Sequence, residues 1–405
     1  MKESGTQKRG SSLLETRRRN RVFIKDTIFR REPVTRTAIA EELGLTLPTI
    51  TTSVNEMMAE GLLRETPLPE EELAGNAGRR PTVLSFEEKA AFAVGAELGP
   101  YATRAVLLDL GGNVLAQSQE AAGDASYEAA LGRLAAQITA LLRGFSREKL
   151  LGVGVGLPGF IEAGEGLIRS SRNADWTGRR LAADLERRLA LPVLIDNNVR
   201  LRAMGYGMEL RGERRDSFAY FYISRGIACP LLVKDDVLSG YTAGAGEIGH
   251  TVLCTRTDGG KESALTLDEL AGEQALLAQC AQAMQEGRAP LLRHLAEQSG
   301  ELTAKQLLEA QQEGEEAVCA ILEKGIEYLG MALANVVNFI NPGFVVVDGY
   351  LMRRPENARR LERAAKSRFF GLNEEEVEIF FQEFDHYSGA RGAAYCIFRR
   401  LLLEK

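Results

Sequence analysis

Several features that mark specialised classes of protein are missing from this sequence of 405 residues. Cysteine is scarce: the five cysteines are odd in number, widely spaced and free of any CxxC pair, which excludes a disulfide framework and a cysteine-rich zinc cluster. The N-terminal segment is polar and charged, without the apolar core of a signal peptide, and no later stretch holds about 18 uncharged apolar residues in a row. We therefore expect a cytoplasmic protein that does not enter a membrane.

What is present is typical of a globular protein, with 45% apolar and 26% charged residues. At about 150 residues per domain, the length predicts two or three domains. Residues 1–50 hold 11 Lys and Arg against 6 Asp and Glu, a net charge of +5, whereas the rest holds 39 against 50, a net charge of −11. The basic front end suggests contact with nucleic acid or another polyanion, and a solvated charged face is the alternative.

Two short helices around a glycine turn are predicted between residues 35 and 60. Thr35 is placed to cap the first, Gly44 supplies the turn, and Thr46 is placed to cap the second. This is the helix-turn-helix pattern, in which the start of the second helix enters the major groove of DNA. Apolar residues share one face of each helix: Ile39, Leu43, Ile50, Val54 and Met57.

The second helix is expected to expose Leu47, Pro48, Thr49, Thr51, Thr52 and Ser53. Hydroxyls can bond bases or phosphates, and apolar groups can touch the thymine methyl. After Leu63 the sequence predicts two short strands with a wing between them, whose arginines would meet phosphates or a minor groove. An ordinary three-helix interaction module is the alternative. The candidate DNA contacts are Arg36, Thr46, Pro48, Thr49, Thr51, Thr52, Arg79 and Arg80.

From Ala91 onward, strand and helix patterns alternate. FAVGAELG, ATRAVLLDL and NVLAQSQ read as strands, with a hairpin turn at Gly111 and Gly112, and LLGVGVGLPG reads as a buried strand that ends in a loop. An amphipathic helix is predicted between them, at SYEAALGRLAAQITALLRGF. This alternation indicates an α/β architecture.

Five motifs then resemble one family: LGVGVGLPGFIE, NADW, LPVLIDNN, GEIGH and ALANVVNFINPGFVVVDG are similar to motifs of the ROK family of repressors, open reading frames and sugar kinases. The front module resembles the winged helix of the repressor branch, including the GRRP turn. The resemblance implies an α/β protein with an N-terminal winged helix-turn-helix (1–86), followed by two actin-like, hexokinase-like (ribonuclease H-like) α/β lobes (87–200 and 201–405) around a sugar cleft. It also implies a homodimer or homotetramer.

At the positions that the family's kinases use for catalysis and phosphate binding, this sequence has different residues. Asn198 stands where the family has its catalytic aspartate, and an amide cannot take the proton of a sugar hydroxyl. The phosphate loops carry Pro100, Tyr101 and Pro230 in place of small residues, which removes backbone donors and space, and Asp348 occupies a glycine position. We therefore expect no kinase activity, no catalytic residue and no cofactor.

The resemblance also supplies the expected ligand contacts. Family members often bind zinc through the histidine of GEIGH and three following cysteines, but only Cys254 follows His250 here, so no metal is expected. Trp176 is expected to pack within its lobe rather than stack on a sugar. The alternative is that the polar residues matched to sugar contacts, six in all, have only structural roles. The residues matched to sugar contacts are Asn173, Asn197, Asn198, Glu247, His250 and Asp268.

Together these patterns predict a transcriptional regulator, a repressor of carbohydrate genes. Its partners would be a double-stranded DNA operator and a carbohydrate effector, whose binding changes the spacing of two winged helices in an oligomer. A sugar kinase fused to a DNA-binding module and an effector-independent repressor with a vestigial cleft are the rivals. A phosphorylated or otherwise anionic effector is a further possibility, because Asn198 removes a negative charge near Arg200 and Arg225.

Overall fold

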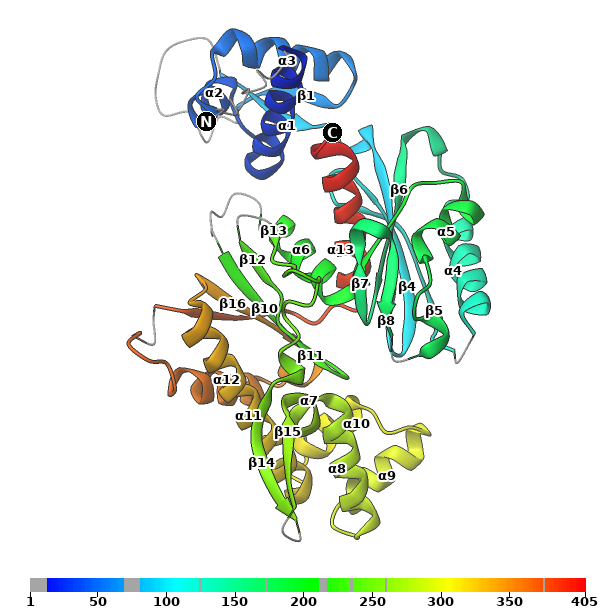
Figure 1. Ribbon diagram of the computed structural model, residues 1–405, viewed down its shortest axis with the longest axis vertical. Coiled ribbons are helices and arrows are strands. Elements are labelled where there is room, and N and C mark those ends of the chain that lie inside the picture. The colour runs from blue at the N-terminus through cyan, green and yellow to red at the C-terminus, as the bar shows by residue number, and fades with distance from the viewer. Residues whose placement is uncertain are drawn as a thin grey trace, which may run out of the picture.

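The computed structural model describes residues 13–68, 81–123, 126–171, 173–210, 217–233, 236–258, 261–373 and 376–405. A small helical module lies at one end of an elongated molecule, followed by a first and then a second α/β lobe (Figure 1). The α/β class expected from the sequence is confirmed. Within the described residues, no helix has the length and apolar character needed to cross a bilayer.

The N-terminal module has three helices and a two-stranded sheet. The Thr35 hydroxyl accepts from the Ala38 N–H, and Gly44 ends the first short helix at φ 62°. The predicted pair of helices around a glycine turn is thus confirmed. The elements are α1 (Leu13–Arg31), α2 (Arg36–Leu43), α3 (Leu47–Ala59), β1 (Leu63–Pro67) and β2 (Thr82–Phe86), the two strands being antiparallel.

Two details of this module differ from expectation. Thr46 stands at the start of α3, but its hydroxyl does not cap the helix and lies 2.9 Å from the Thr49 hydroxyl instead. Ser53 is not exposed; only 5% of it is accessible, because it shares the inward face of α3 with Ile50 and Val54. Of the apolar residues expected to form the core of the module, Ile39, Ile50, Val54 and Met57 are buried, whereas Leu43 is only half-buried.

The first lobe is built on a five-stranded sheet of order β5-β4-β3-β6-β9. The hairpin predicted between its second and third strands is confirmed, with Gly112 at φ 86°. Helices α4 (Tyr127–Leu141) and α5 (Leu181–Leu189) cover one face (Figure 1). The strands are β3 (Phe92–Leu98), β4 (Ala102–Asp109), β5 (Val114–Ala121), β6 (Leu150–Leu157) and β9 (Val193–Asn197), with a side hairpin of β7 (Phe160–Glu162) and β8 (Leu167–Ser170).

The last helix of the chain, α13 (Ser388–Phe398), lies across β3 and β6 of this first sheet. A Cβ on Gly95 would stand 1.8 Å from the Ala390 carbonyl oxygen, and one on Gly154 would stand 2.0 Å from the Ala393 carbonyl oxygen. Only glycine at these two positions allows the helix to lie so close to the sheet. The lobe boundaries expected from the sequence stay a prediction, but the C-terminal end packs on the first lobe.

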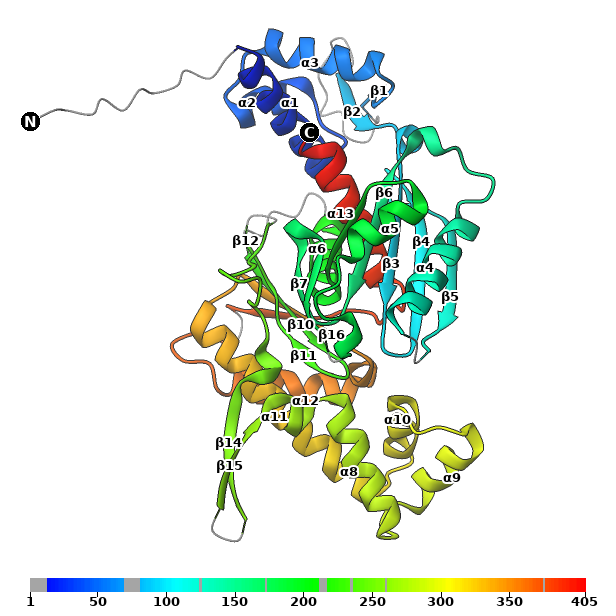
Figure 2. The same cartoon turned by 45° about the vertical axis from the view of Figure 1, so that its right-hand side comes forward.

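The second lobe holds a mixed sheet of order β13-β12-β10-β16-β17, with β11 paired to β10. The long helix α11 (Glu316–Ile340) packs against α12 (Pro355–Lys366), and a hairpin of β14 and β15 extends away from the body (Figure 2). The strands are β10 (Ser217–Ile223), β11 (Ile227–Ala228), β12 (Leu231–Val233), β13 (Asp236–Val237), β14 (Val252–Asp258), β15 (Lys261–Thr266), β16 (Phe344–Gly349) and β17 (Glu378–Phe381). The other helices of this half are α6 (Asn198–Glu209), α7 (Leu267–Ala271), α8 (Glu273–Gln285), α9 (Pro290–Ser299) and α10 (Ala304–Gln312).

One apolar core joins the helical module to the first lobe. It contains Ile24 and Ile28 of α1 as well as Ala394 and Phe398 of α13. At the same contact the buried Lys25 ammonium donates to the Leu402 carbonyl, in the helical turn η8 (Arg399–Leu403) that continues α13. The module is therefore packed directly onto the end of the chain (Figure 2).

Candidate functional site

The start of α3 carries most of the residues expected to contact DNA. Thr46, Pro48 and Thr52 are exposed, and Thr49 and Thr51 are half-buried. The Thr52 hydroxyl donates to the Pro48 carbonyl at 3.0 Å, which holds that side chain along the helix. The structure thus gathers these five residues at one helix end.

Arg36 of α2 has partners inside the module. Its guanidinium pairs with Glu65 of β1 and donates to the Asn55 side-chain oxygen at 3.3 Å. Arg36 therefore links two helices and a strand, and its contact with DNA stays a prediction. Arg79 and Arg80, the arginines expected on the wing, lie outside the described residues.

Asn198 opens α6 at the junction of the two lobes and is only 7% exposed. Its side-chain amide donates to the Glu97 carboxylate of β3 at 3.1 Å. The catalytic position implied by the family resemblance thus carries a hydrogen-bond donor directed at a carboxylate. An amide has no basic lone pair for a sugar hydroxyl's proton, so it cannot act as a general base there.

Arg202, one turn further along α6, is the centre of a buried network that spans both lobes. Its guanidinium grips Glu97 of β3 with two bonds of 3.0 and 2.8 Å, and it lies 3.4 Å from the Asp348 carboxylate of β16. It also donates to the Ser388 hydroxyl at the start of α13 and lies 4.8 Å from the centre of the Tyr222 ring. Five elements from the two lobes therefore meet at one cation.

The charges of this network are almost fully removed from water: the Arg202, Glu97 and Asp348 side chains are 4%, 2% and 1% exposed. Burial lowers the pKa of Arg202, but its two carboxylates outweigh burial and hold that pKa well above its usual range. Burial raises the pKa of Asp348 against the pull of Arg202, and the Tyr220 hydroxyl donates to the same carboxylate at 2.7 Å. A guanidinium with this geometry is paired and hydrogen-bonded, as a buried charge must be.

Nearer the surface, the two loops that correspond to the phosphate loops of the family's kinases, around Tyr101 and Arg225, contact each other. The Tyr101 hydroxyl, from the first lobe, donates to Glu273 at the start of α8, and Arg225 lies 4.9 Å from the centre of the Tyr101 ring. Burial raises the pKa of Glu273 and, with help from Glu273, raises the pKa of Tyr101 to about 12. These loops bridge the lobes directly.

Asp196, Asn197 and Arg200 are occupied by local bonds. Asn197 caps α6, accepting from two backbone N–H groups at 2.9 and 3.3 Å and donating to the Gly159 carbonyl at 3.0 Å. Arg200 pairs with Asp196 and donates to the carbonyls of Ala243 and Ile161 at 2.7 and 2.9 Å. Arg200 is therefore not available for an anionic ligand.

The GEIGH segment lies on the second lobe, around the short helical turn η6 (Ile248–His250). Glu247 and His250 are both exposed as whole residues, but partial burial of the Glu247 carboxyl raises its pKa, and the nearby His250 opposes that rise. The Asp268 carboxylate accepts from the Ile227 N–H at 2.8 Å, and a Cβ on Gly249 would lie 2.2 Å from it. Asp268 thus lies directly against the GEIGH turn.

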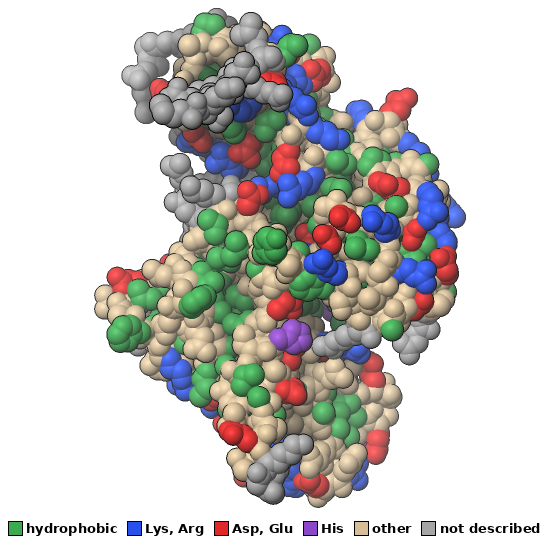
Figure 3. Space-filling view, in the orientation of Figure 1, with side chains coloured by type: hydrophobic (Ala, Val, Ile, Leu, Met, Phe, Trp, Pro, Cys, Tyr) green, Lys and Arg blue, Asp and Glu red, His purple; other side chains and the backbone are tan. Residues whose placement is uncertain are grey.

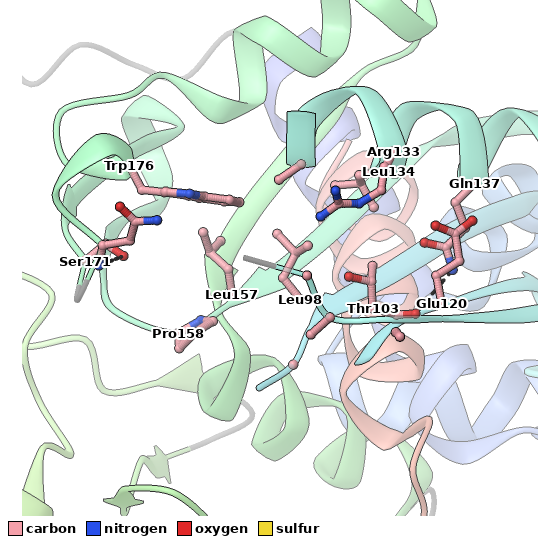
Figure 4. Close-up of a pocket in the computed structure, with 16 residues that line it drawn as sticks. Leu98, Thr103, Glu120, Arg133, Leu134, Gln137, Leu157, Pro158, Ser171 and Trp176 are labelled. Carbon is pink, nitrogen blue, oxygen red and sulfur yellow. Dashed lines mark hydrogen bonds between the residues drawn. The ribbon is translucent and has the colours of Figure 1, made fainter. Parts of the chain in front are cut away.

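Asn173 has only local hydrogen-bond partners among the described residues, and none of them is another residue matched to sugar contacts. Its side-chain oxygen caps the turn η5 (Ala174–Trp176), accepting from the Asp175 N–H at 3.1 Å. It lines a cavity of the first lobe with Trp176, whereas Glu247 lines a groove of the second lobe, and the other four residues matched to sugar contacts line neither. In the space-filling view the molecule is hollowed between the first lobe and the helical end of the second (Figure 3). Figure 4 shows the cavity of the first lobe, with Trp176 on one side and Arg133 of α4 on the other.

No group of three His, Cys, Asp or Glu side chains in the described ranges is arranged to hold a metal ion. The sequence patterns did not predict that Arg202, Glu97 and Tyr101 take part in contacts between the lobes. They did identify the first loop and Asp348 as differences from the family's kinases. The available signal was a second arginine, Arg202, in a mostly apolar stretch of helix that follows a strand end.

Two α/β lobes joined by buried polar contacts, with a helical module ahead of them, define a two-lobed α/β protein of the hexokinase type. A model of the ROK family matches residues 93–400, well over half of the chain. The chain belongs to the ROK family.

Similar proteins include both regulators and enzymes. A xylose repressor of Caldicellulosiruptor bescii is 26% identical over 335 residues, which cover 81% of this chain and 82% of that protein. A ROK family transcriptional regulator homologous to the Escherichia coli MLC protein superposes with a TM-score of 0.77 at 18% identity, covering 96% of this chain and 97% of that one. A ROK family glucokinase of Streptomyces griseus, solved with glucose and AMPPNP, superposes with a TM-score of 0.66 at 20% identity, covering 76% and 99%.

Proposed function

We propose that this protein is a sugar-responsive, DNA-binding transcriptional repressor whose kinase-like body has lost catalysis. The observation that carries the proposal is the Arg202 network, because a buried guanidinium occupies the lobe junction where the family resemblance implies the nucleotide phosphates. The likeness to a named xylose repressor and to a transcriptional regulator supports the same function.

Loss of phosphoryl transfer follows from which groups are free to act. Glu97 is held by Arg202 and Asn198, Asp196 is held by Arg200, and an amide stands at the catalytic position. None of these groups is free to accept the proton of an attacking hydroxyl. A coupled assay of ADP release with glucose, xylose and N-acetylglucosamine tests this, and turnover that disappears in an Asn198→Ala variant would establish the rival, a kinase fused to a DNA-binding module.

The helical module is proposed to be a winged helix-turn-helix, with α3 as the recognition helix. Its exposed start presents hydroxyls and Pro48, which suit phosphates and thymine methyls more than bidentate base contacts. Arg79→Ala or Arg80→Ala should weaken operator binding by a similar factor on all sequences and lower the salt slope by about 1. An unchanged slope in both variants would remove the wing from the interface.

We propose that α13 transmits the state of the lobes to the recognition helix. Ser388 at its start contacts Arg202, and Leu402 beyond its end receives the Lys25 ammonium of α1. Helix α1 in turn pairs Arg17 and Arg21 with glutamates of the α3 helix and its C-cap. A movement of the lobes about Arg202 would thus reach α3 through two packed helices.

Sugar binding must favour one lobe arrangement strongly for this to work. Shifting a population from 1:99 to 99:1 requires a preference of about 10⁴-fold, or about 5.5 kcal/mol.

The contact of Lys25 with Leu402 tests this route. In a Lys25→Met variant we expect operator binding and sugar binding to persist, while the effect of the sugar on operator affinity becomes smaller. Lys305→Met, at an exposed lysine of α10, is the matched control. Full coupling in Lys25→Met would rule out this route.

The effector is proposed to be a neutral sugar that contacts Glu247, His250 and Asp268. Arg200 is paired with Asp196, and Arg225 lies against the Tyr101 ring. These two arginines therefore do not support an anionic effector. Calorimetry with glucose and glucose 6-phosphate tests this, since tighter binding of the phosphate would contradict it. An absence of binding by any sugar would favour an effector-independent repressor.

The proposal also includes a homodimer that binds a two-fold operator. Analytical ultracentrifugation, which measures the mass of the assembly, tests this.

A further inference from the structure

We propose that the start of α1 forms a second DNA-contacting surface, which binds phosphates beside the groove that receives α3. The inference rests on the proposed function and adds a surface to which none of the candidate DNA contacts named above belongs. In both views the start of α1 lies beside α3, whereas its end lies near the C-terminal helix (Figure 1 and Figure 2). The surface thus lies at the end of the module farthest from the lobes.

The positive charge of the front end of the chain is concentrated in α1. This helix holds seven Lys and Arg against Glu15 and Asp26, a net charge of +5, which equals the net charge of residues 1–50 as a whole. The rest of that segment therefore has no net charge. Cations gathered along one helix are the electrostatic footprint expected of a surface that binds nucleic acid.

Two of these seven cations have no acidic partner inside the protein. Arg18 and Arg19 are exposed, and neither forms an ion pair with another described residue. Their guanidiniums are therefore open to an anion from outside the protein. The other five are Arg17 with Glu56, Arg21 with Glu60, Arg30 and Arg31 with Glu42, and Lys25 with the Leu402 carbonyl.

The ion pairs of Arg17 and Arg21 determine where this surface lies relative to α3. Glu56 and Glu60 belong to the last turn and the C-cap of α3, so the start of α1 is held at the end of α3 opposite Pro48. A helix rises about 18 Å between positions 48 and 60, and the major groove is about 12 Å wide. When the start of α3 enters the groove, the start of α1 is therefore placed over the phosphates that border it.

The same ion pairs remove an electrostatic obstacle. Unpaired carboxylates on Glu56 and Glu60 would repel phosphates at this end of α3, and the arginines of α1 neutralise both. Arg18 and Arg19 then outnumber Glu15, the acid in the first turn of α1. The surface at the start of α1 is therefore positive.

The buried Lys25 on the same helix reports this positive potential. Burial and the charges of Arg21 and Arg18 outweigh the attraction of Glu60 and lower the pKa of Lys25 to about 8. The cations of α1 are thus not fully compensated by the acids around them. An added phosphate would lower the energy of this arrangement.

Contacts of this kind hold the protein on DNA without reading its sequence. The test therefore uses full-length protein and a random-sequence duplex of about 30 base pairs, or three helical turns, with affinity measured by fluorescence anisotropy over a series of salt concentrations. Arg18→Ala/Arg19→Ala should lower the slope of log K against log salt by about 1.8, because each phosphate contact contributes about 0.9. Each single variant should bind about eightfold more weakly at about 0.1 M salt, which is a slope change of about 0.9 over one decade of salt.

Two variants serve as controls for charge and for folding. Arg133→Ala/Arg143→Ala removes two exposed arginines of the first lobe that likewise have no ion pair with a described residue, and it should keep the wild-type slope. Arg18→Lys/Arg19→Lys keeps both charges at the start of α1 and should also keep that slope. Equal thermal midpoints of the alanine variants and the wild type check that the exposed substitutions leave the fold intact.

The outcomes separate this inference from the proposed function. The inference alone is overturned if the wild type binds the duplex with a salt-dependent affinity and Arg18→Ala/Arg19→Ala has the same slope. It is also overturned if the first-lobe control lowers the slope equally, since the effect would then come from net charge. A wild type that does not bind duplex DNA even at low salt would overturn the proposed function and this inference together.

Discussion

Replacing Arg202 by methionine probes the buried network at the lobe junction. The change keeps much of the side-chain volume but leaves Glu97 without its two guanidinium bonds and Asp348 without its cation. Removing one partner of a buried ion pair costs about 3–5 kcal/mol, because the other charge stays in the core uncompensated. At about 3 kcal/mol per molar of urea, the midpoint should fall by about 1–1.7 M.

The assay is urea unfolding followed by Trp176 fluorescence, which reports on the first lobe. A chain of this size need not unfold in a single step, so the midpoints of this one transition are compared rather than total free energies. The double variant Glu97→Met/Arg202→Met should recover part of the loss, since it removes the uncompensated charge of Glu97 and leaves only that of Asp348. A midpoint unchanged in Arg202→Met, or a double variant less stable than the single one, would refute the reasoning.

The pH dependence gives an independent check. Burial already raises the pKa of Asp348, and loss of Arg202 should raise it further. A raised folded-state pKa stabilises the protein fully below the unfolded pKa, and that contribution is lost as pH rises through the folded value. The deficit of Arg202→Met relative to the wild type should therefore be smaller at about pH 5 than at about pH 8.

Three further predictions follow from local contacts. Thr35→Ala should lower the stability of the helical module by about 1 kcal/mol through loss of its cap, whereas Thr46→Ala should have a smaller effect because its hydroxyl caps nothing; amide hydrogen exchange in α2 and α3 measures both. Burial lowers the pKa of Lys25 to about 8, so the wild type should gain stability as pH rises from about 8 toward the unfolded value near 10.4, and Lys25→Met should not; thermal midpoints across that range decide it. Tyr101→Phe removes the bond to Glu273 between the lobes and should widen the distribution of lobe separations in small-angle scattering, while Tyr241→Phe, on a fully exposed ring, should not.

Sequence patterns predicted the caps and turns that depend only on residues close together in the chain. The Thr35 cap, the turn at Gly44 and the hairpin at Gly112 are each decided by residues within a few positions of one another, and the structure confirms them. Thr46 shows the limit of such patterns, because a residue suited to capping found a neighbouring hydroxyl instead.

The buried network could not be predicted in this way. Arg202 meets Glu97 across 105 residues and Asp348 across 146, and only the packed fold brings these charges together. The resemblance drew attention to the first loop and to Asp348 as departures, but the reason for them appears only with the arginine in place. For Lys25 and Leu402, 377 residues apart, no sequence pattern signals the contact.

The position of α13 also has a consequence for the order in which the protein is made. The first sheet ends with β9 at Asn197, yet the helix that covers its β3 and β6 begins only at Ser388. At about 5–20 residues per second, a ribosome needs roughly 10–40 s to cross that interval, during which Gly95 and Gly154 lack their covering helix. The helical module that contains Lys25 is synthesised first, but it can pack onto α13 and η8 only after the second lobe has been translated.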